Sequence, residues 1–172
     1  MCGTNNSMKN KEIKQIPTQF DKSKEAETIS RDLISKYHTS LINSKIAYLF
    51  KNKPILKGGK VVIATAEKCS VKSNALVKYD DEDTDAFDFI ITISYPAWNR
   101  LNDKQRIAII DHELEHCLIT EDENTGDKKI SIVSHDVEEF ASIIRRHGLY
   151  KEDLQKIKNV MDACEIEVED DE

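Results

Sequence analysis

The sequence predicts a small α+β protein with one domain, and three features support this class. A chain of 172 residues can bury an ordinary core but has no room for a second catalytic domain. Segments 60–68 and 86–94 are rich in β-branched residues, which favours strands. Segments 23–51 and 102–118 carry apolar residues at intervals of three and four, which favours amphipathic helices.

The N-terminal half of the chain predicts an arm, a helical region and strands. Residues 1–20 are polar and lack periodicity, so we expect a flexible arm. The periodicity of 23–51 predicts one helix, or two with a break near Asn43. A strand at 60–68 follows, and a short further strand is expected at Ala75–Tyr79, before the strand at 86–94.

The helix expected at 102–118 has a defined start and one apolar stripe. Asn102 or Asp103 is a plausible N-cap residue. Further along, 126–134 predicts a short strand. The next helix should begin at Asp136, with Glu139 completing a capping box, and should end at Gly148.

A last helix is expected at 151–163. The domain boundaries that follow are a flexible arm at 1–20, one folded domain at 21–163 and an acidic C-terminal tail at 164–172.

Charge and composition exclude several classes of partner. The net charge is −7 and the lysines are spread along the chain, which argues against direct nucleic-acid binding. No apolar run approaches the roughly 18 residues of a membrane span, so no membrane partner is expected. The first residues, MCGTNNSMKNKEIKQ, lack the apolar region of a secretory signal, which predicts a cytoplasmic protein.

The four cysteines give no sign of a thiolate metal site or a redox motif, because no two stand in a C-x-x-C pair. Cys2 follows Met1 as in amidotransferases with an N-terminal cysteine nucleophile, but the polar segment after it argues against a buried strand there. Cys117 belongs to the apolar stripe of its helix, which predicts a core position.

The stretch DHELEHC contains residues whose types and spacing are typical of a catalytic metal site. His112 and His116 are four residues apart, so on a helix both imidazoles can reach one ion from the same face. Glu113 lies beside them and can reach a water on that ion. Chance would give this pattern about 0.01 times in such a chain. A charged helix surface is the bland alternative, but the apolar residues on both sides argue against it.

A catalytic zinc site normally has three protein ligands, so a third must come from elsewhere. His135 is the first candidate, because it follows His116 by 19 positions, after a loop and a short strand. Glu138 and Glu139 are the alternatives, since a carboxylate from the next helix can also complete such a site. His38 has no such context, and we expect a structural role for it.

The runs WNRLNDKQRIAIIDHELEHC and HDVEEFASIIRRHG resemble the putative phage metallopeptidase family over about residues 56–150, and more distantly the SprT-like zincins. In those zincins a glycine stands where this chain has Asp136. The resemblance implies a minimal zincin-like fold: a small antiparallel or mixed sheet packed against an N-terminal helix and the H-E-x-x-H helix. It also implies a set of functional residues, namely zinc ligands His112, His116 and His135 and a catalytic acid and base, Glu113.

The resulting hypothesis is a zinc metallopeptidase that hydrolyses peptide bonds of a peptide or protein substrate, with Glu113 as general base. The strand at 86–94 is the candidate edge strand for pairing with a substrate. His147, Tyr150 and Tyr95 are candidates for the oxyanion stabiliser. The alternative hypothesis is a zinc-stabilised binding protein without catalytic activity, such as a phage accessory or anti-host factor.

Overall fold

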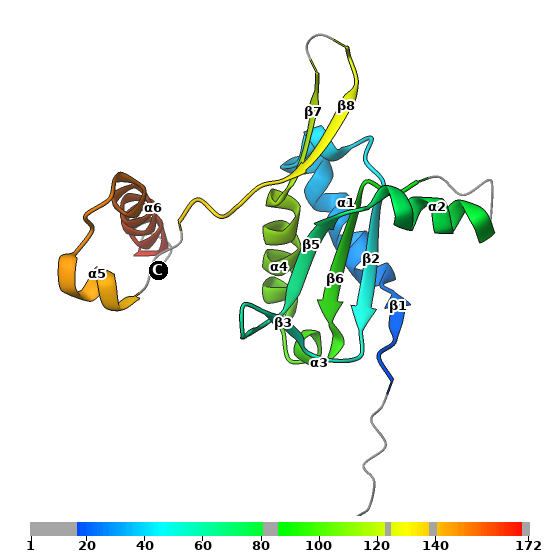
Figure 1. The fold of residues 1–172 in the computed structure, drawn as a ribbon. Coiled ribbons are helices and arrows are strands. Elements are labelled where there is room, and N and C mark those ends of the chain that lie inside the picture. The colour runs from blue at the N-terminus through cyan, green and yellow to red at the C-terminus, as the bar shows by residue number, and fades with distance from the viewer. Residues whose placement is uncertain (1–16, 81–85, 123–124, 138–140, 170–172) are drawn as a thin grey trace, which may run out of the picture.

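The computed structural model describes residues 17–80, 86–122, 125–137 and 141–169 of the chain. The described residues combine small β-sheets with helices, which confirms the predicted α+β class (Figure 1). Helices α5 and α6 lie to one side of the body formed by the main sheet, α1 and α4 (Figure 1). Within the described part, no helix combines the length and hydrophobicity that a membrane span requires.

The main sheet has four strands in the order β1-β2-β6-β5. Strands β2 and β6 run parallel, while β1 and β5 run antiparallel to their neighbours. The sheet is therefore mixed, and β6 is central because it pairs on both sides. The strand bounds are β1 Phe20–Lys22, β2 Ile46–Lys51, β5 Ala64–Lys68 and β6 Phe89–Ser94.

Helices α1 (Lys24–Lys36) and α4 (Asp103–Glu115) pack against each other and against the sheet. The Ser23 hydroxyl accepts from the Ala26 N–H and caps α1. Asn102 and Gln105 form a reciprocal capping box at the start of α4, so the N-cap predicted at Asn102 is confirmed. Their apolar faces form one core with the sheet: Ala26, Leu33, Tyr48, Phe89, Ile91, Ile93, Trp98, Ile110 and Leu114.

Two hairpins extend from this body. Strands β3 (Ile55–Lys57) and β4 (Lys60–Val62) form one, and β7 (Cys117–Glu121) and β8 (Lys128–Ile132) form the other. The second hairpin begins directly after α4 and leads the chain back toward that helix, which matters for the site.

The remaining elements are short or peripheral. The 3₁₀ helix η1 (Thr39–Leu41) follows α1, and α3 (Tyr95–Trp98) follows β6 and buries Trp98. Helix α2 spans Val71–Asp80. The C-terminal helices are α5 (Ala141–His147) and α6 (Glu152–Glu169).

Two of the predicted elements in the N-terminal half were wrong. Residues 46–51 form strand β2 rather than the end of a helix, because their backbone pairs with β1 on one side and with β6 on the other. The strand expected at Ala75–Tyr79 lies within helix α2. Short apolar runs suit either structure, and only tertiary pairing decides between them.

Two further corrections concern the surroundings of the predicted site. The strand proposed as the sheet edge, 86–94, contains β6, which lies inside the sheet; the edge strands are β1 and β5, and β5 is the one that contacts α4. The described part of helix α5 spans Ala141–His147, and the predicted capping box of Asp136 with Glu139 stays a prediction because Glu139 lies outside the described residues. The predicted end at Gly148 is confirmed, since its N–H donates to the Ile144 carbonyl with φ at +67°.

Candidate metal centre

Helix α4 presents two imidazoles from its last turn. His112 and His116 are one helical turn apart, and their ring centroids are 5.0 Å from each other. His116 is the C-cap residue, after which the chain turns directly into β7. The predicted helical context of the H-E-x-x-H motif is therefore present.

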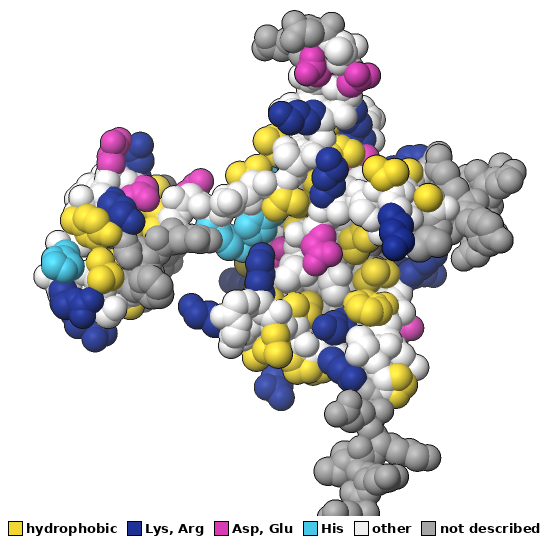
Figure 2. All heavy atoms as spheres, viewed as in Figure 1, with side chains coloured by type: hydrophobic (Ala, Val, Ile, Leu, Met, Phe, Trp, Pro, Cys, Tyr) yellow, Lys and Arg dark blue, Asp and Glu magenta, His cyan; other side chains and the backbone are white. Residues whose placement is uncertain are grey.

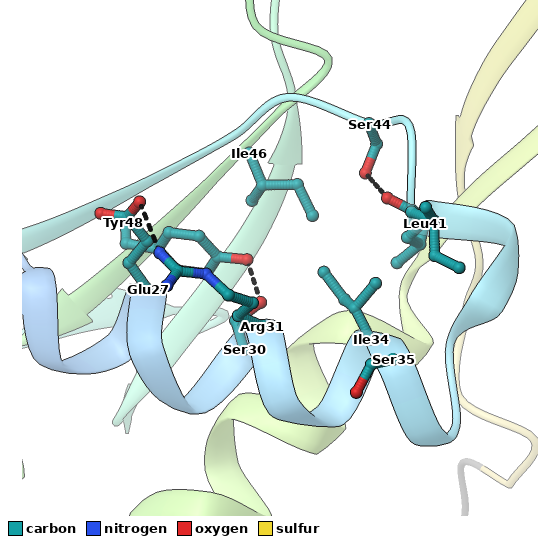
Figure 3. Close-up of a pocket in the computed structure, with 10 residues that line it drawn as sticks. Glu27, Ser30, Arg31, Ile34, Ser35, Leu41, Ser44, Ile46 and Tyr48 are labelled. Atoms are coloured by element: carbon teal, nitrogen blue, oxygen red, sulfur yellow. Dashed lines mark hydrogen bonds and ion pairs between the residues drawn. The ribbon is translucent and has the colours of Figure 1, made fainter.

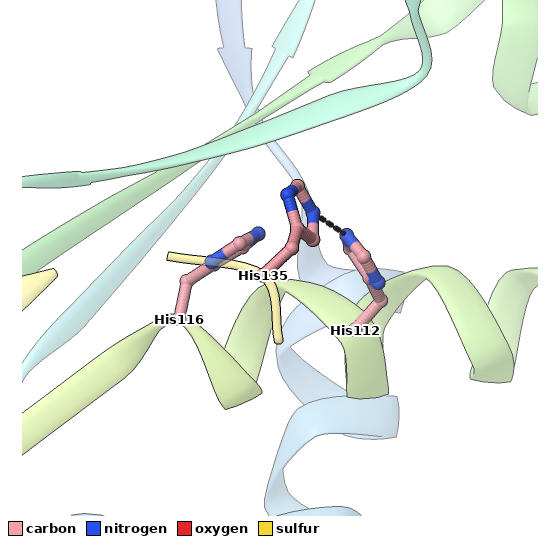
Figure 4. Close-up of side chains that lie close together, drawn as sticks. All are labelled: His112, His116 and His135. Atoms are coloured by element: carbon pink, nitrogen blue, oxygen red, sulfur yellow. Dashed lines mark hydrogen bonds between the residues drawn. The ribbon is translucent and has the colours of Figure 1, made fainter. Parts of the chain in front are cut away.

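The β7–β8 hairpin brings His135 to these two side chains. Cys117 pairs with Ile132 at the base of the hairpin, and one residue further the Val133 N–H donates to the His116 carbonyl at 2.8 Å. The His135 ring lies 4.6 Å from the His116 ring and 5.0 Å from the His112 ring, between centroids. The three side chains converge from two separate segments (Figure 4).

The donor atoms of this cluster fit a single metal ion. One ligand nitrogen from each of the three histidines lies within 4.8 Å of the other two, and the Nε2 atoms of His112 and His135 are 3.0 Å apart. A tetrahedral zinc ion with Zn–N bonds of about 2.0–2.1 Å needs ligand nitrogens about 3.3 Å apart. The distance between His112 and His135 is close to that requirement, and three histidines with an open fourth position are a known catalytic donor set.

Hydrogen bonding and burial prepare two of the imidazoles for a metal. The Nδ1–H of His116 donates to the Val133 carbonyl at 2.6 Å, which leaves the Nε2 lone pair for an ion. Burial, the other two histidines and Lys57 lower the pKa of His112. The neutral imidazole is the form that binds a metal, so a lowered pKa favours binding.

Glu113 is buried beside the histidines, at 6% exposure. Burial raises the pKa of its carboxyl, while the nearby His116 and a hydrogen bond from the Ala66 backbone act in the opposite direction. Ala66 belongs to the edge strand β5, so this contact ties the carboxylate to the sheet. A carboxyl that is shielded from water and close to the metal ligands has the surroundings of a general base.

A cavity of about 290 Å³ lies between α4 and the strands β4 and β5, lined by His112, Glu113, His116 and His135. A second cavity, of about 720 Å³, continues along the other side of His116 and His135. Figure 2 shows the histidine side chains exposed at the centre of this face, with Lys and Arg side chains next to them. The cluster is therefore accessible to a substrate.

A separate pocket of about 400 Å³ lies between α1, η1 and β2 (Figure 3). Its lining includes Ser30 and Tyr48, whose hydroxyls share a hydrogen bond, and the exposed ion pair of Arg31 with Glu27. None of the histidine cluster lines it. Its polar groups bond to one another rather than converge on the space, so we assign it no chemistry.

Sequence reasoning missed two contacts that fix the site. The buried His38 ring bonds through Nε2 to Asp111 at 2.6 Å and so attaches the residue before His112 to the α1–η1 turn. The bond from His116 to Val133 involves a backbone carbonyl, so no side-chain pattern could reveal it. For Asp111, its place directly before the motif was the available signal.

The other candidates stand apart from the cluster or outside the described residues. Among the described residues, neither cavity beside the histidines is lined by Tyr95, His147 or Tyr150. Glu138 and Glu139 lie outside the described residues. Cys2 does too. Cys117 is buried, and its thiol donates to the Glu113 carbonyl at 3.5 Å, as a core position predicts.

Comparison with known proteins gives the family. No curated protein and no solved structure matches this chain significantly. The model of the family described as putative phage metallopeptidase matches residues 18–165. That range contains the main sheet, α4 and the histidine cluster. The chain belongs to the putative phage metallopeptidase family.

Proposed function

We propose that this protein is a zinc-dependent peptidase whose metal ligands are His112, His116 and His135 and whose general base is Glu113. The observation that carries the proposal is the convergence of three imidazole nitrogens within 4.8 Å, next to a buried glutamate in an open cavity. Imidazole ligands suit zinc, which has no redox chemistry and serves hydrolysis. Membership of a metallopeptidase family supports the same reaction.

Each side chain has a defined task in this reaction. When bound, zinc supplies a Lewis acid that polarises the scissile carbonyl and lowers the pKa of water toward about 7. Glu113 accepts the proton of the attacking water and returns it to the leaving amine. The Ala66 N–H holds the Glu113 carboxylate in place during both transfers. The Val133 carbonyl keeps His116 in the tautomer that binds metal.

The edge strand β5 supports an extended peptide as substrate. The Ile63 carbonyl accepts from the Ser94 N–H, and the Cys69 N–H donates to the Asp88 carbonyl, so the backbone groups of Ile63 and Cys69 face β6. In an antiparallel pair, successive residues turn their backbone N–H and C=O groups alternately toward and away from the neighbouring strand. Ala64 and Ala66 therefore direct their backbone groups away from β6, toward the side of α4, where the Ala66 N–H donates to Glu113 and the other outward groups can pair with a peptide. A peptide that pairs there would lie along the 290 Å³ cavity and across the histidine cluster.

The decisive experiment separates metal binding from catalysis in one pair of variants. We expect wild type to contain about one zinc per chain and to cleave peptides, and Glu113→Gln to keep its zinc but lose at least about 100-fold in kcat. Glu115→Gln is the matched control, because Glu115 is exposed on the same helix. It should retain both properties.

Two outcomes would reject the proposal. Equal cleavage by Glu113→Gln and Glu115→Gln would remove Glu113 from the chemistry. Zinc in wild type without cleavage of any member of a degenerate peptide library would favour the zinc-stabilised binding protein instead.

A further inference from the structure

The β3–β4 hairpin carries two lysines at the entrance to the cleft. Lys57 and Lys60 face each other across the register, on either side of the turn Gly58–Gly59. Both glycines have positive φ, +55° and +77°, as a tight two-residue hairpin turn requires. The turn geometry therefore fixes the two lysines opposite each other at the tip of a short hairpin.

Placing Lys57 and Lys60 opposite each other does not stabilise the hairpin. Like charges directly opposite in an antiparallel pair repel each other. Among the described residues, neither lysine has an acidic partner, whereas Lys128 pairs with Asp88 at 2.7 Å and Lys156 with Glu152 at 2.9 Å. The protein has seven more acidic than basic residues, so acidic partners are abundant elsewhere on its surface.

Both lysines line the space around the metal centre. Lys57 lines the 290 Å³ and the 720 Å³ cavities, and Lys60 lines the larger one. The charge of Lys57 is close enough to act on both His112 and Glu113. Two positive charges without an acidic partner among the described residues thus line the cavities beside the three histidines, next to apolar residues such as Val62 and Ile132.

We propose that Lys57 and Lys60 select peptides that carry a carboxylate near the scissile bond. The proposal rests on the function proposed above and adds the substrate class. The carboxylate can come from an acidic side chain or from the C-terminus of the peptide, and the chemistry at the lysines is the same. An extended peptide on β5 turns alternate side chains to the same face, so acidic residues at every second position fit best.

The test measures binding, so it does not depend on turnover. Zinc-loaded Glu113→Gln protein is titrated into three rhodamine-labelled decapeptides and anisotropy is recorded at low salt. One peptide alternates Val with Glu and ends in an amide; the second replaces Glu with Gln; the third is the Gln peptide with a free C-terminal carboxylate. We expect the Glu peptide to bind about fivefold or more tightly than the Gln peptide, with a difference that shrinks at high salt.

Variants assign the preference to the hairpin. Lys57→Gln combined with Lys60→Gln should reduce the preference for Glu to less than about twofold, and Lys57→Glu should reverse it. Lys72→Glu, at the exposed start of α2, is the matched control and should leave the preference unchanged. Preference for the third peptide over the second would identify the C-terminal carboxylate as the recognised group.

Equal binding of all three peptides, or no binding of any, would overturn this inference. So would a preference for carboxylates that survives in the double variant. Cleavage by wild type without such a preference would leave the peptidase intact and reject only the substrate class. A lysine-dependent preference without cleavage by wild type would support recognition of carboxylates by the two lysines and reject the peptidase.

Discussion

At the residue scale, the arrangement around His116 explains how a distant histidine reaches the motif. Its backbone carbonyl accepts from the Val133 N–H, and its ring donates to the Val133 carbonyl. The C-cap residue of α4 is thus bound twice to the residue that follows β8. His135 follows two residues later, so its position depends on this double contact rather than on a helix.

We predict that His135→Ala lowers zinc affinity by about 100-fold or more, because two histidines on one helix leave the ion with too few protein ligands. Competition with a chromogenic zinc chelator measures the change. His147→Ala is the control, since His147 is exposed on α5 and lines neither cavity. Unchanged affinity in His135→Ala would assign the third ligand to another residue.

Burial of Tyr48 leads to a prediction for the stability of the protein at alkaline pH. Burial raises its pKa to about 12, although the hydrogen bond with Ser30 opposes this. The unfolded chain ionises Tyr48 near its ordinary pKa of 10, so the folded state binds more protons between these values. Stability should therefore fall as pH rises from 10 to 12, by on the order of 2 kcal/mol.

Urea unfolding at pH 9, 10 and 11 checks this prediction, with Tyr48→Phe as the reference. The variant should lose less stability over the same pH range, even though its starting stability is lower, because the Ser30 hydroxyl loses its partner. An equal loss of stability in wild type and in Tyr48→Phe would contradict the assignment of this pH dependence to Tyr48.

At the element scale, α4 is held in place by α1 through one carboxylate. The two oxygens of Glu25 accept from the Trp98 indole at 3.0 Å and from Arg106 at 2.8 Å. The Arg106 guanidinium also lies 5.5 Å from the centre of the Trp98 ring. This contact fixes the start of α4, while His38 and Asp111 fix its end.

We predict that Glu25→Gln reduces the free energy of unfolding by about 1 kcal/mol, because an amide has one acceptor atom where the carboxylate uses two. The partial exposure of the pair keeps the effect moderate. Glu27→Gln is the matched control: Glu27 lies on the same helix, and its ion pair in the described part of the chain is with exposed Arg31. Chemical denaturation of both variants distinguishes a loss specific to Glu25 from a general effect of charge.

The elements of this fold differ in how far their own residues predict them. The start of helix α4 was predictable because its cap and apolar stripe agree, and its spacing identified the two histidines. The predicted end at 118 was wrong, because α4 ends at Glu115 and Cys117 begins strand β7. Strand β2 was not, because an apolar run such as 46–50 suits a helix as well as a strand until its neighbours are known. His135 was predicted as a candidate from its residue type and position, but its contact with His112 depends on the register of β7 with β8. Such pairing between distant segments leaves no local pattern.

At the scale of the whole molecule, the core and the candidate metal centre share the same part of the chain. The core cluster in the described residues runs from Ala26 to Ile130, and the last histidine of the site is His135. Helices α5 and α6 lie apart from this body (Figure 1). Leu154 is the buried apolar residue described on α6, and it is not a member of the core cluster.

We therefore predict that a chain ending at Val137 folds and binds about one zinc, with a melting temperature within about 5 °C of the full chain. Removal of α5 and α6 takes away no described core residue, and a loss of 1 kcal/mol corresponds to only about 2–4 °C at this size. Calorimetry and metal content of both chains provide the measurement. A shortened chain that unfolds or loses zinc would show that residues 138–172 support the fold or the candidate metal site.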